Sequence, residues 1–430
     1  MDKLLNTIQR QLQERERFRA ASFILREQST GAETLLDSPL AKVVMGPRRS
    51  GKSVFCHQIL RNRDYAYVNL DDENLAGKTD HDALINAVNR VYEGLKTVFF
   101  DEIQNLERWE LLVNRLLREG YNVILTGSNS RLLSSELATA LTGRHLPIEV
   151  LPFSFNEYLK CTKGLPEDLA NPAAIPKTEL LPALEKYLLS GGFPEPVVYG
   201  LDSGQYLSTL LDSILFKDIV ARYHVRYSSQ LRELAMTLTS GMSNEYTLQK
   251  LVRNLGFSGV ATASKYLGYL EESFLFFSLR RFSFRLKEQF KAPRKTYLVD
   301  NGLYSASAFR ISPGTGRLVE NAAFLHLVRS GFRPNIELFS YKTRQGREVD
   351  FILRSGIKPV SLIQVAHDIS EQKTLERELR SLAEASGEMN VTDDLQLVTW
   401  DTEGTESYKG LKIKILPMWK WIGSPVKARA

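Results

Sequence analysis

The 430-residue sequence predicts an α/β fold made of several domains. Over residues 41–150, short apolar runs alternate with amphipathic stretches, which is typical of a parallel sheet covered by helices on both faces. A glycine-rich turn joins the first apolar run to a helical stretch. After a mostly helical segment at 178–240, a second mixed α/β pattern occupies residues 315–425.

Composition excludes several other classes of protein. Hydrophobic residues make up 43 % of the chain and charged residues 25 %, which is typical of a soluble globular protein. No apolar run approaches the ~18–20 residues that span a bilayer, and the first residues lack the apolar core of a secretory signal. Cys56 and Cys161 are too few for a disulfide framework or a zinc cluster. We therefore expect a cytoplasmic protein with no membrane partner.

The elements of the first 160 residues follow from these patterns. Residues 1–40 predict an amphipathic helix followed by a polar region, with a loop at 29–34. The five strands of the parallel sheet are predicted at residues 42–45, 65–70, 97–100, 122–126 and 146–151. The helical stretches between them are expected to cover the sheet on both faces.

The glycine-rich turn at residues 46–53 fits the pattern G-x-x-x-x-G-K-[ST] in its strand–loop–helix context. Glycines let backbone N–H groups close around phosphates, and the helix N-terminus adds to their attraction. Lys52 is expected to reach the β- and γ-phosphates, and the Ser53 hydroxyl to bind Mg²⁺. The alternative is a chance glycine-rich turn. The residues assigned to the nucleotide are Gly46, Pro47, Arg48, Arg49, Ser50, Gly51, Lys52, Ser53 and Val54.

Two carboxylates end the strand at 97–100. Asp101, at the strand tip, is expected to hold Mg²⁺ directly or through water, while Glu102 points elsewhere and polarises the attacking water. The alternative is a solvated acidic strand end. Together with the preceding motif, the Asp-Glu pair predicts that the protein hydrolyses ATP rather than only binding it.

Two further polar positions are candidates for sensing the γ-phosphate. Ser128 follows the strand at 122–126, and Thr126 in the same turn is an equally open choice; an ordinary N-cap serine is the alternative. Arg144 follows a predicted helix and precedes the strand at 146–151. It is expected to act on a neighbouring subunit as an arginine finger, unless it is only a surface arginine after a helix-ending glycine.

Together these motifs resemble the AAA-type ATPases. More narrowly, the chain resembles bacterial and archaeal ATP-binding proteins that join an AAA domain to a winged helix and a nuclease-like domain. The blocks at 141–159 and 189–197 also look like that family, although a second sensor arginine is missing from the helical segment. The resemblance implies ATP and Mg²⁺ as cofactors and a homohexameric ring. The implied division is 1–160 (ATPase), 161–240 (helical lid), 241–310 (winged helix) and 311–430 (nuclease-like).

Basic charge gathers in one segment of the chain. The whole sequence carries a net charge of +6, and residues 244–298, with ten Lys or Arg and four Glu, carry +6 by themselves. Predicted helices at 244–256 and 261–275, followed by strands at 274–280 and 295–299, resemble a winged helix. DNA contact is expected, without base-specific reading, unless the segment docks on an acidic face of the same assembly. The assigned residues are Lys265, Arg280, Arg281, Arg285, Lys287, Lys291, Arg294 and Lys295.

The C-terminal pattern resembles the PD-(D/E)xK nucleases. In that family, positions matching Glu320, Asp350 and Gln364 bind a divalent metal, and a lysine two residues after the third ligand assists. Here Gln364 replaces an acid and Ala366 replaces that lysine. An amide is a poorer Mg²⁺ ligand than a carboxylate, so we expect a nuclease-like fold without cleavage. His367 and Asp368 could serve as metal ligands instead, but their spacing does not favour this. Alternatively, the strand that contains Asp350 is simply a core strand with an exposed aspartate.

Three functions follow from this sequence. The first is an ATP-driven motor or remodeller acting on DNA, with helicase-like or branch-migration-like activity in repair or recombination. The second is a nucleotide-controlled switch acting on a protein partner. The third is an ATP-coupled nuclease, against which Gln364 and Ala366 speak.

Overall fold

The computed structural model describes residues 2–77, 79–127, 141, 143–164, 172, 175–307 and 314–426. The chain divides into two compact units. The first comprises Met1–Phe153 with Glu272–Phe274, and the second comprises Ser154–Glu271 and Leu275–Ala430. The division into four domains at residues 160, 240 and 310 stays a prediction.

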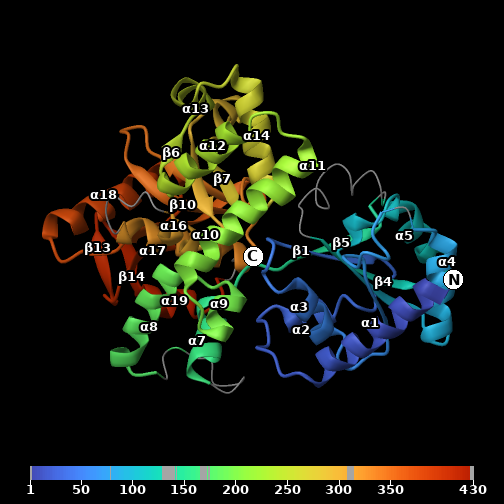
Figure 1. The fold of residues 1–430 in the computed structure, drawn as a ribbon. Helices are drawn as coiled ribbons and strands as arrows, with labels where there is room; N and C mark the ends of the chain where they lie inside the picture. The colour runs from blue at the N-terminus through green and yellow to red at the C-terminus, as the bar shows by residue number, and fades with distance from the viewer. Residues whose placement is uncertain are drawn as a thin grey trace. The chain divides into compact units, whose positions relative to one another are not determined.

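The first unit is built on a five-stranded parallel sheet (Figure 1). From one edge to the other its strands are β2 (Ala66–Asn69), β3 (Thr97–Asp101), β4 (Asn122–Gly127), β1 (Ala41–Met45) and β5 (His145–Glu149). All five predicted strands and their parallel pairing are confirmed. The C-terminal ends of β1, β3 and β4 are neighbours, so the polar residues that follow these strands lie at one edge of the sheet.

Two apolar cores cover the faces of this sheet. Val43 and Met45 of β1 face one core, and Val44 between them faces the other, as strand alternation requires. The first core includes residues of α1 (Asp2–Ala20), α4 (His81–Val91) and α5 (Trp109–Arg118). The second includes residues of α2 (Ser29–Glu33) and α3 (Lys52–Ile59). The loop predicted at 29–34 was wrong: Ser29 and Ala32 are buried there, and the segment forms the short helix α2.

The second unit starts with a run of helices, which confirms the helical prediction for residues 178–240. Ser154 and Glu157 form a reciprocal capping box at the start of the first helix. The helices are α7 (Phe155–Lys163), α8 (Lys177–Ser190), α9 (Pro194–Tyr199), α10 (Ser203–Ser213), the π-helical segment η5 (Ile214–Val220), α11 (Ala221–Tyr223) and α12 (Ser228–Ser240). Within the part of the chain that is described, no helix is long and apolar enough to cross a membrane.

A small antiparallel sheet with the order β6-β8-β7 follows these helices. Its segment contains β6 (Glu245–Tyr246), α13 (Leu248–Leu255), α14 (Val260–Glu272), β7 (Phe276–Arg280), α15 (Leu286–Lys291) and β8 (Arg294–Leu298). The helix predicted to begin at residue 244 begins at Leu248 instead. Glu245 and Tyr246 pair with β8, and the Thr247 side chain caps the helix by accepting from the Lys250 N–H. The short helix α15 between the strands was not predicted.

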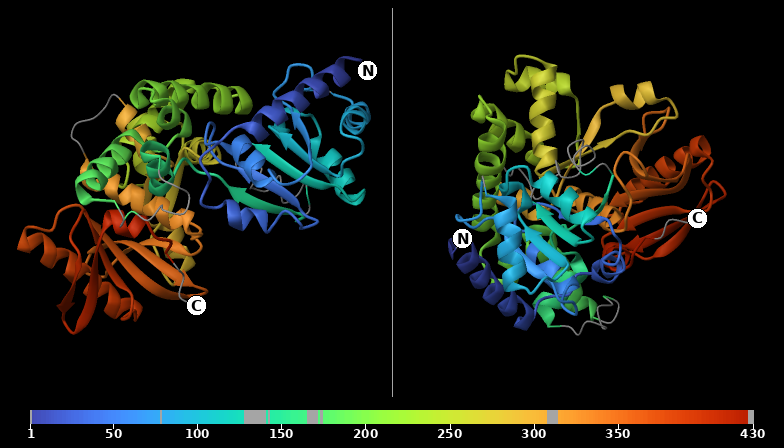
Figure 2. Two further views of the ribbon diagram at one scale, coloured as in Figure 1. Left: turned by 90° about the horizontal axis from the view of Figure 1, so that it is seen from below. Right: turned by 90° about the vertical axis from the view of Figure 1, so that its right-hand side faces the viewer.

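The C-terminal part contains a mixed six-stranded sheet, shown in orange to red in Figure 2. Its order is β13 (Gly404–Tyr408), β14 (Leu411–Pro417), β12 (Leu395–Thr399), β11 (Lys358–Ala366), β10 (Glu348–Ser355) and β9 (Leu338–Lys342). β11, β12 and β14 run parallel, and the outer pairs run antiparallel. The associated helices are α16 (Asn301–Ala306), α17 (Thr315–Arg329), α18 (Gln372–Met389) and α19 (Met418–Ile422).

A buried aspartate joins two distant loops of the second unit. Asp300, at the start of α16, accepts hydrogen bonds from the backbone N–H groups of Gly192 (2.7 Å) and Gly302 (2.8 Å). Burial raises the pKa of Asp300 to about 6. Gly191 has a positive φ of 76°, and a Cβ placed there would lie 1.8 Å from Asp300 Oδ1. The turn between α8 and α9 therefore fits against α16 only as glycine.

Candidate nucleotide site

The loop at 46–53 passes very close to the end of β5. Gly46 has a φ of 150°, and a Cβ at this position would lie 2.1 Å from the Val150 carbonyl oxygen. Gly51 is in the left-handed region, with a φ of 89°, and precedes the first turn of α3. Both glycines are needed for the path of the loop. The backbone conformation alone therefore accounts for glycine at these two positions of the motif.

Lys52 folds back into this loop. Its side chain is buried, and Nζ donates to the carbonyl oxygens of Pro47 (2.9 Å) and Gly46 (3.3 Å). The Ser50 hydroxyl is buried as well and has no hydrogen-bond partner among the residues described by the structure. An unsatisfied buried hydroxyl beside a buried ammonium suits an anionic ligand. The loop therefore fits the phosphates of ATP.

Asp101 gathers hydroxyl groups at the end of β3. Its Oδ1 accepts from Ser53 Oγ at 3.0 Å and from Thr126 Oγ1. Its Oδ2 accepts from the Tyr67 hydroxyl at 3.4 Å. Burial raises the pKa of Asp101 to about 6, while the Thr126 hydrogen bond acts to lower it. Ser53 and Asp101 thus place hard oxygen ligands side by side, which is the chemistry that Mg²⁺ requires.

Glu102 directly follows Asp101 and has an unusual backbone conformation. Its φ of 52° is left-handed, and its backbone N–H donates to Thr126 Oγ1 at 2.9 Å. The Gln104 side chain donates to the Glu102 carboxylate. Thr126 therefore contacts both acidic residues. Its hydroxyl donates to the Asp101 carboxylate, and its oxygen accepts from the Glu102 backbone N–H. Ser128, the other sensor candidate, lies outside the described residues.

Arg26 contributes to this site but was missed in the sequence. Its buried guanidinium donates to the Ser50 carbonyl oxygen at 3.0 Å and to the Leu151 carbonyl oxygen, and stacks over Phe153 at 5.1 Å. It thereby ties the phosphate-binding loop to the chain that follows β5. Arg26 lies 20 residues before the motif in a polar segment, so no local pattern identifies it.

Arg144 lies at the opposite end of the sheet. It precedes β5, and its carbonyl oxygen accepts from the N–H of Ala41 at the start of β1. Its exposed side chain lines an open hollow of about 530 Å³, together with His81, Leu111, Leu112, Asn114, Arg115 and Arg118. Asp101 and Lys52 lie at the C-terminal ends of the parallel strands, so Arg144 is remote from its own nucleotide site.

Family models match three consecutive parts of the chain. One described as "AAA domain" matches residues 38–159. Two described as domains of unknown function, DUF8612 and DUF4143, match residues 181–313 and 315–421. The first match contains the phosphate-binding loop, Asp101, Glu102 and Thr126, whereas Arg26 precedes it.

Two relatives are similar in sequence over most of this chain. "Uncharacterized protein MJ1544" of Methanocaldococcus jannaschii is 34 % identical over 397 residues, covering 88 % of this chain and 87 % of the relative. The chain belongs to the same family of AAA-domain proteins. An "Uncharacterized protein" of Haemophilus influenzae is 31 % identical over 358 residues. The match covers 78 % of this chain and 84 % of the relative. Residues 38–159 are thus an AAA-type ATPase domain, which binds ATP.

Solved structures show looser similarity to this AAA-domain protein. The Walker-type ATPase PABY2304 of Pyrococcus abyssi is 16 % identical, with a TM-score of 0.42, covering 66 % of this chain and 95 % of that chain. The RuvB Holliday junction branch migration motor of Thermotoga maritima is 17 % identical, with a TM-score of 0.31. The match covers 59 % of this chain and 90 % of that chain.

The cations assigned to DNA differ widely in exposure in the AAA-domain protein. Lys265, Arg285, Lys287 and Lys291 are exposed, whereas Arg280, Arg281 and Arg294 are half-buried. Arg281 pairs with Glu245 at 2.6 Å, and Arg285 pairs with Glu288 at 3.1 Å. Lys295 is buried among carboxylates, so its assignment to a DNA phosphate was wrong.

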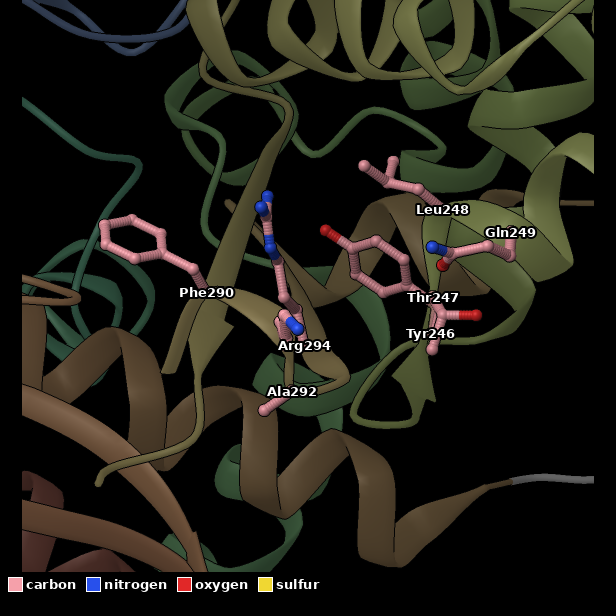
Figure 3. A pocket seen from close by; sticks show the side chains of 8 residues that line it. Tyr246, Thr247, Leu248, Gln249, Phe290, Ala292 and Arg294 are labelled. Carbon is pink, nitrogen blue, oxygen red and sulfur yellow. The ribbon is translucent and has the colours of Figure 1, made fainter. Parts of the chain in front are cut away.

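A basic and aromatic hollow of about 440 Å³ lies beside the small sheet. Figure 3 shows Arg294 extending between the Phe290 ring and the Tyr246 ring. Arg280 is directly opposite Arg294 in the β7–β8 ladder, and its guanidinium lies 4.6 Å from the Phe290 ring centroid. Burial lowers the pKa of Arg280, and the neighbouring Arg294 lowers it further. Because like charges opposed across a ladder repel, an anion in this hollow would be stabilised.

The C-terminal structure brings the three predicted metal-site positions together. Glu320 of α17 and Asp350 of β10 both contact the Lys295 ammonium at 2.9 Å. The Gln364 side chain accepts from the Asp350 backbone N–H at 3.2 Å and donates to Glu378 at 2.9 Å. Lys295 of β8 therefore lies among these positions, which no local sequence signal indicated.

Proposed function

We propose that this AAA-domain protein hydrolyses ATP with Mg²⁺ and acts on DNA in the cytoplasm as an oligomeric motor or remodeller. The observation that carries the hydrolytic part is the grouping of Lys52, Ser53, Asp101 and Glu102 at one edge of the sheet. Lys52 would hold the phosphates, and Ser53 with Asp101 would hold the metal ion, which neutralises phosphate charge. Glu102 would orient the attacking water.

The DNA part of the proposal depends on the segment that contains β6, β7, β8 and the helices α13 and α14. We infer a winged helix from this order of elements. Its hairpin carries the exposed cations Arg285, Lys287 and Lys291 next to the hollow of Tyr246, Phe290 and Arg294. Cations combined with aromatic rings suit a nucleic-acid strand, through phosphate contacts and base stacking.

Arg144 supports self-association. It lies at the N-terminal edge of the parallel sheet, so its guanidinium would act on a nucleotide bound by an adjacent subunit. We therefore propose a ring, with six subunits by analogy with other AAA proteins. A nuclease-like fold for the C-terminal domain is part of the same proposal.

The decisive experiment measures steady-state ATP hydrolysis with and without duplex, single-stranded and four-way-junction DNA. We expect one DNA form to raise the rate several-fold, with no hydrolysis in Lys52→Ala and Glu102→Gln. Replacing Arg285, Lys287 and Lys291 together by Gln should remove the stimulation and leave the basal rate. It should also lower the salt dependence of duplex binding, by about 0.9 in log–log slope for each phosphate that the protein no longer neutralises.

The matched control replaces three exposed lysines elsewhere in the second unit, Lys358, Lys412 and Lys414, by Gln. It should retain both stimulation and salt dependence. Hydrolysis that no DNA form changes would refute the DNA motor.

One observation favours a second function, a nucleotide-controlled switch that binds a protein partner. Phe284, Leu286 and Phe290 are 68 %, 69 % and 58 % exposed on and beside α15. Apolar side chains exposed together commonly mark a protein interface. Hydrolysis that is indifferent to DNA, together with solubility gained by Phe284→Ser and Leu286→Ser, would favour this switch.

A further inference from the structure

Lys295 is the most enclosed cation of the basic segment. Its side chain is 3 % exposed, and Nζ lies 2.9 Å from Glu320, 2.9 Å from Asp350 and 2.7 Å from Glu348. An ammonium has three N–H donors, and here there are three carboxylates to receive them. Burial acts to lower the pKa of Lys295, but the surrounding acidic groups, Asp350 above all, raise it well above its ordinary value. The lysine is therefore charged.

Strand geometry brings this cluster together. Lys295 and Tyr297 are two residues apart on β8 and share one face, and the Tyr297 hydroxyl donates to Glu320 at 2.7 Å. Glu348 and Asp350 are likewise two residues apart on β10. The cluster therefore joins the small sheet, α17 and the C-terminal sheet through one ammonium.

Several oxygens that a metal would need already have donors. Asp350 Oδ1 accepts from Lys295, and its Oδ2 accepts from the Val365 backbone N–H at 3.0 Å. Glu320 Oε1 accepts from both Lys295 and Tyr297, and Gln364 is held between Asp350 and Glu378. No group of three His, Cys, Asp or Glu side chains is arranged to hold a metal ion in the described ranges of the chain.

We propose that the Lys295 ammonium takes the place of a divalent cation in this cluster, so that the C-terminal domain works without a metal and does not cut DNA. The ammonium sits where the acidic side chains of α17 and β10 converge, which is where a metal would bridge them. It supplies only one positive charge, but it is covalently attached and cannot dissociate. The proposal is independent of the ATPase and of DNA binding.

A consequence is that removing the ammonium should uncover a site for a divalent metal. Lys295→Ala leaves Glu320, Glu348 and Asp350 facing a space without a cation, and carboxylate oxygens are the ligands of Mg²⁺ and Mn²⁺. A metal ion that entered would restore the missing positive charge. A lysine with a merely structural packing role would create no such affinity.

The test measures Mn²⁺ binding by electron paramagnetic resonance, and thermal unfolding with and without Mn²⁺. It uses the full nucleotide-free chain as wild type, Lys295→Ala, Asp350→Asn, and Lys295→Ala with Asp350→Asn. Any Mn²⁺ bound near Asp101 is common to all four and cancels in the comparison. We expect Lys295→Ala to bind one more Mn²⁺ than wild type and to gain thermal stability from it, and the double variant to lose both gains.

Lys295→Ala that gains no Mn²⁺ would overturn the proposal. So would a wild-type chain that binds a Mn²⁺ which Asp350→Asn removes, because Lys295 would then accompany a metal rather than replace it. If Lys295→Ala does not fold, wild type and Asp350→Asn still decide. Equal Mn²⁺ binding by these two chains supports the proposal, and unequal binding contradicts it.

Discussion

Lys52 and Lys295 are both buried near carboxylates, and they are used in opposite ways. Lys52 donates to the carbonyl oxygens of Gly46 and Pro47, which are neutral, while Asp101 is bound by the hydroxyls of Ser53 and Thr126. Lys295 donates to three carboxylates directly. In the first site two hydrogen bonds of the ammonium go to neutral carbonyl groups, whereas in the second its hydrogen bonds go to carboxylates.

This difference shows how similar residues give a ligand site or a structural one. Hydrogen bonds to carbonyl oxygens leave an ammonium its attraction for an incoming phosphate, because carbonyl groups carry no net charge. An ammonium surrounded by carboxylates has little attraction left for any further anion. The arrangement of partners, rather than burial or residue type, separates the two roles.

The largest effect is expected from exchanging each lysine for methionine, which keeps the length but removes the charge. Lys52→Met should lower ATP hydrolysis by about 10²–10³-fold, because a preorganised charge on the phosphates is lost, with little change in stability. Lys295→Met should leave hydrolysis per folded molecule unchanged. It should destabilise the second unit by about 3–5 kcal/mol, because buried carboxylates lose their counter-ion.

Hydrolysis assays and urea unfolding of both variants test this pair. If both variants lost stability equally, or both lost hydrolysis equally, the contrast between the two lysines would not hold.

A smaller effect is expected from loosening the first site without touching a phosphate contact. Arg26→Gln leaves the buried carbonyl oxygens of Ser50 and Leu151 without their donor, at about 1–3 kcal/mol for each unsatisfied group. Because Ser50 belongs to the phosphate-binding loop, ATP affinity measured by calorimetry should fall. Arg10→Gln is the control, since Arg10 is exposed and its pairing with Asp72 contributes at most about 1 kcal/mol. An unchanged affinity in Arg26→Gln would show that the loop needs no such support.

The smallest effect tests how much the second site depends on its neutral donor. Tyr297→Phe removes the hydrogen bond to Glu320 but leaves Lys295 in place, so we expect a loss of about 1 kcal/mol in unfolding free energy. Tyr199→Phe is a suitable control because Tyr199 is 72 % exposed. A loss as large as that of Lys295→Met would mean that Tyr297, rather than the ammonium, holds the cluster together.

The first site could be predicted from the sequence because its parts are local. Residues 46–53 form one turn, and Asp101 with Glu102 follows one buried strand, so strand order alone brings them to the same edge. The first unit's strands were predictable for the same reason, because each is a short apolar run between helical stretches. Arg26 could not be found, since its partners are backbone carbonyl oxygens, which any residue supplies.

The second site could not be predicted because its charges come from distant segments. Lys295 lies in the run R-K-T-Y-L after several exposed cations, so its charge pointed to phosphates. Only strand alternation distinguishes Lys295 from the exposed cations, because Lys295 shares a strand face with the buried Tyr297. That signal was available, but it could not reveal that Glu320, Glu348 and Asp350 lie opposite.

The fit between Gly191 and Asp300 has a consequence for how this family can diverge. A Cβ at Gly191 would meet the Asp300 carboxylate, and that carboxylate holds the N–H of Gly192. Neither residue can be exchanged alone without either a steric overlap or an unpaired buried N–H. Substitutions at these two positions, more than a hundred residues apart, should therefore be inherited together. Sequence drift around them would be slow even where no ligand is bound.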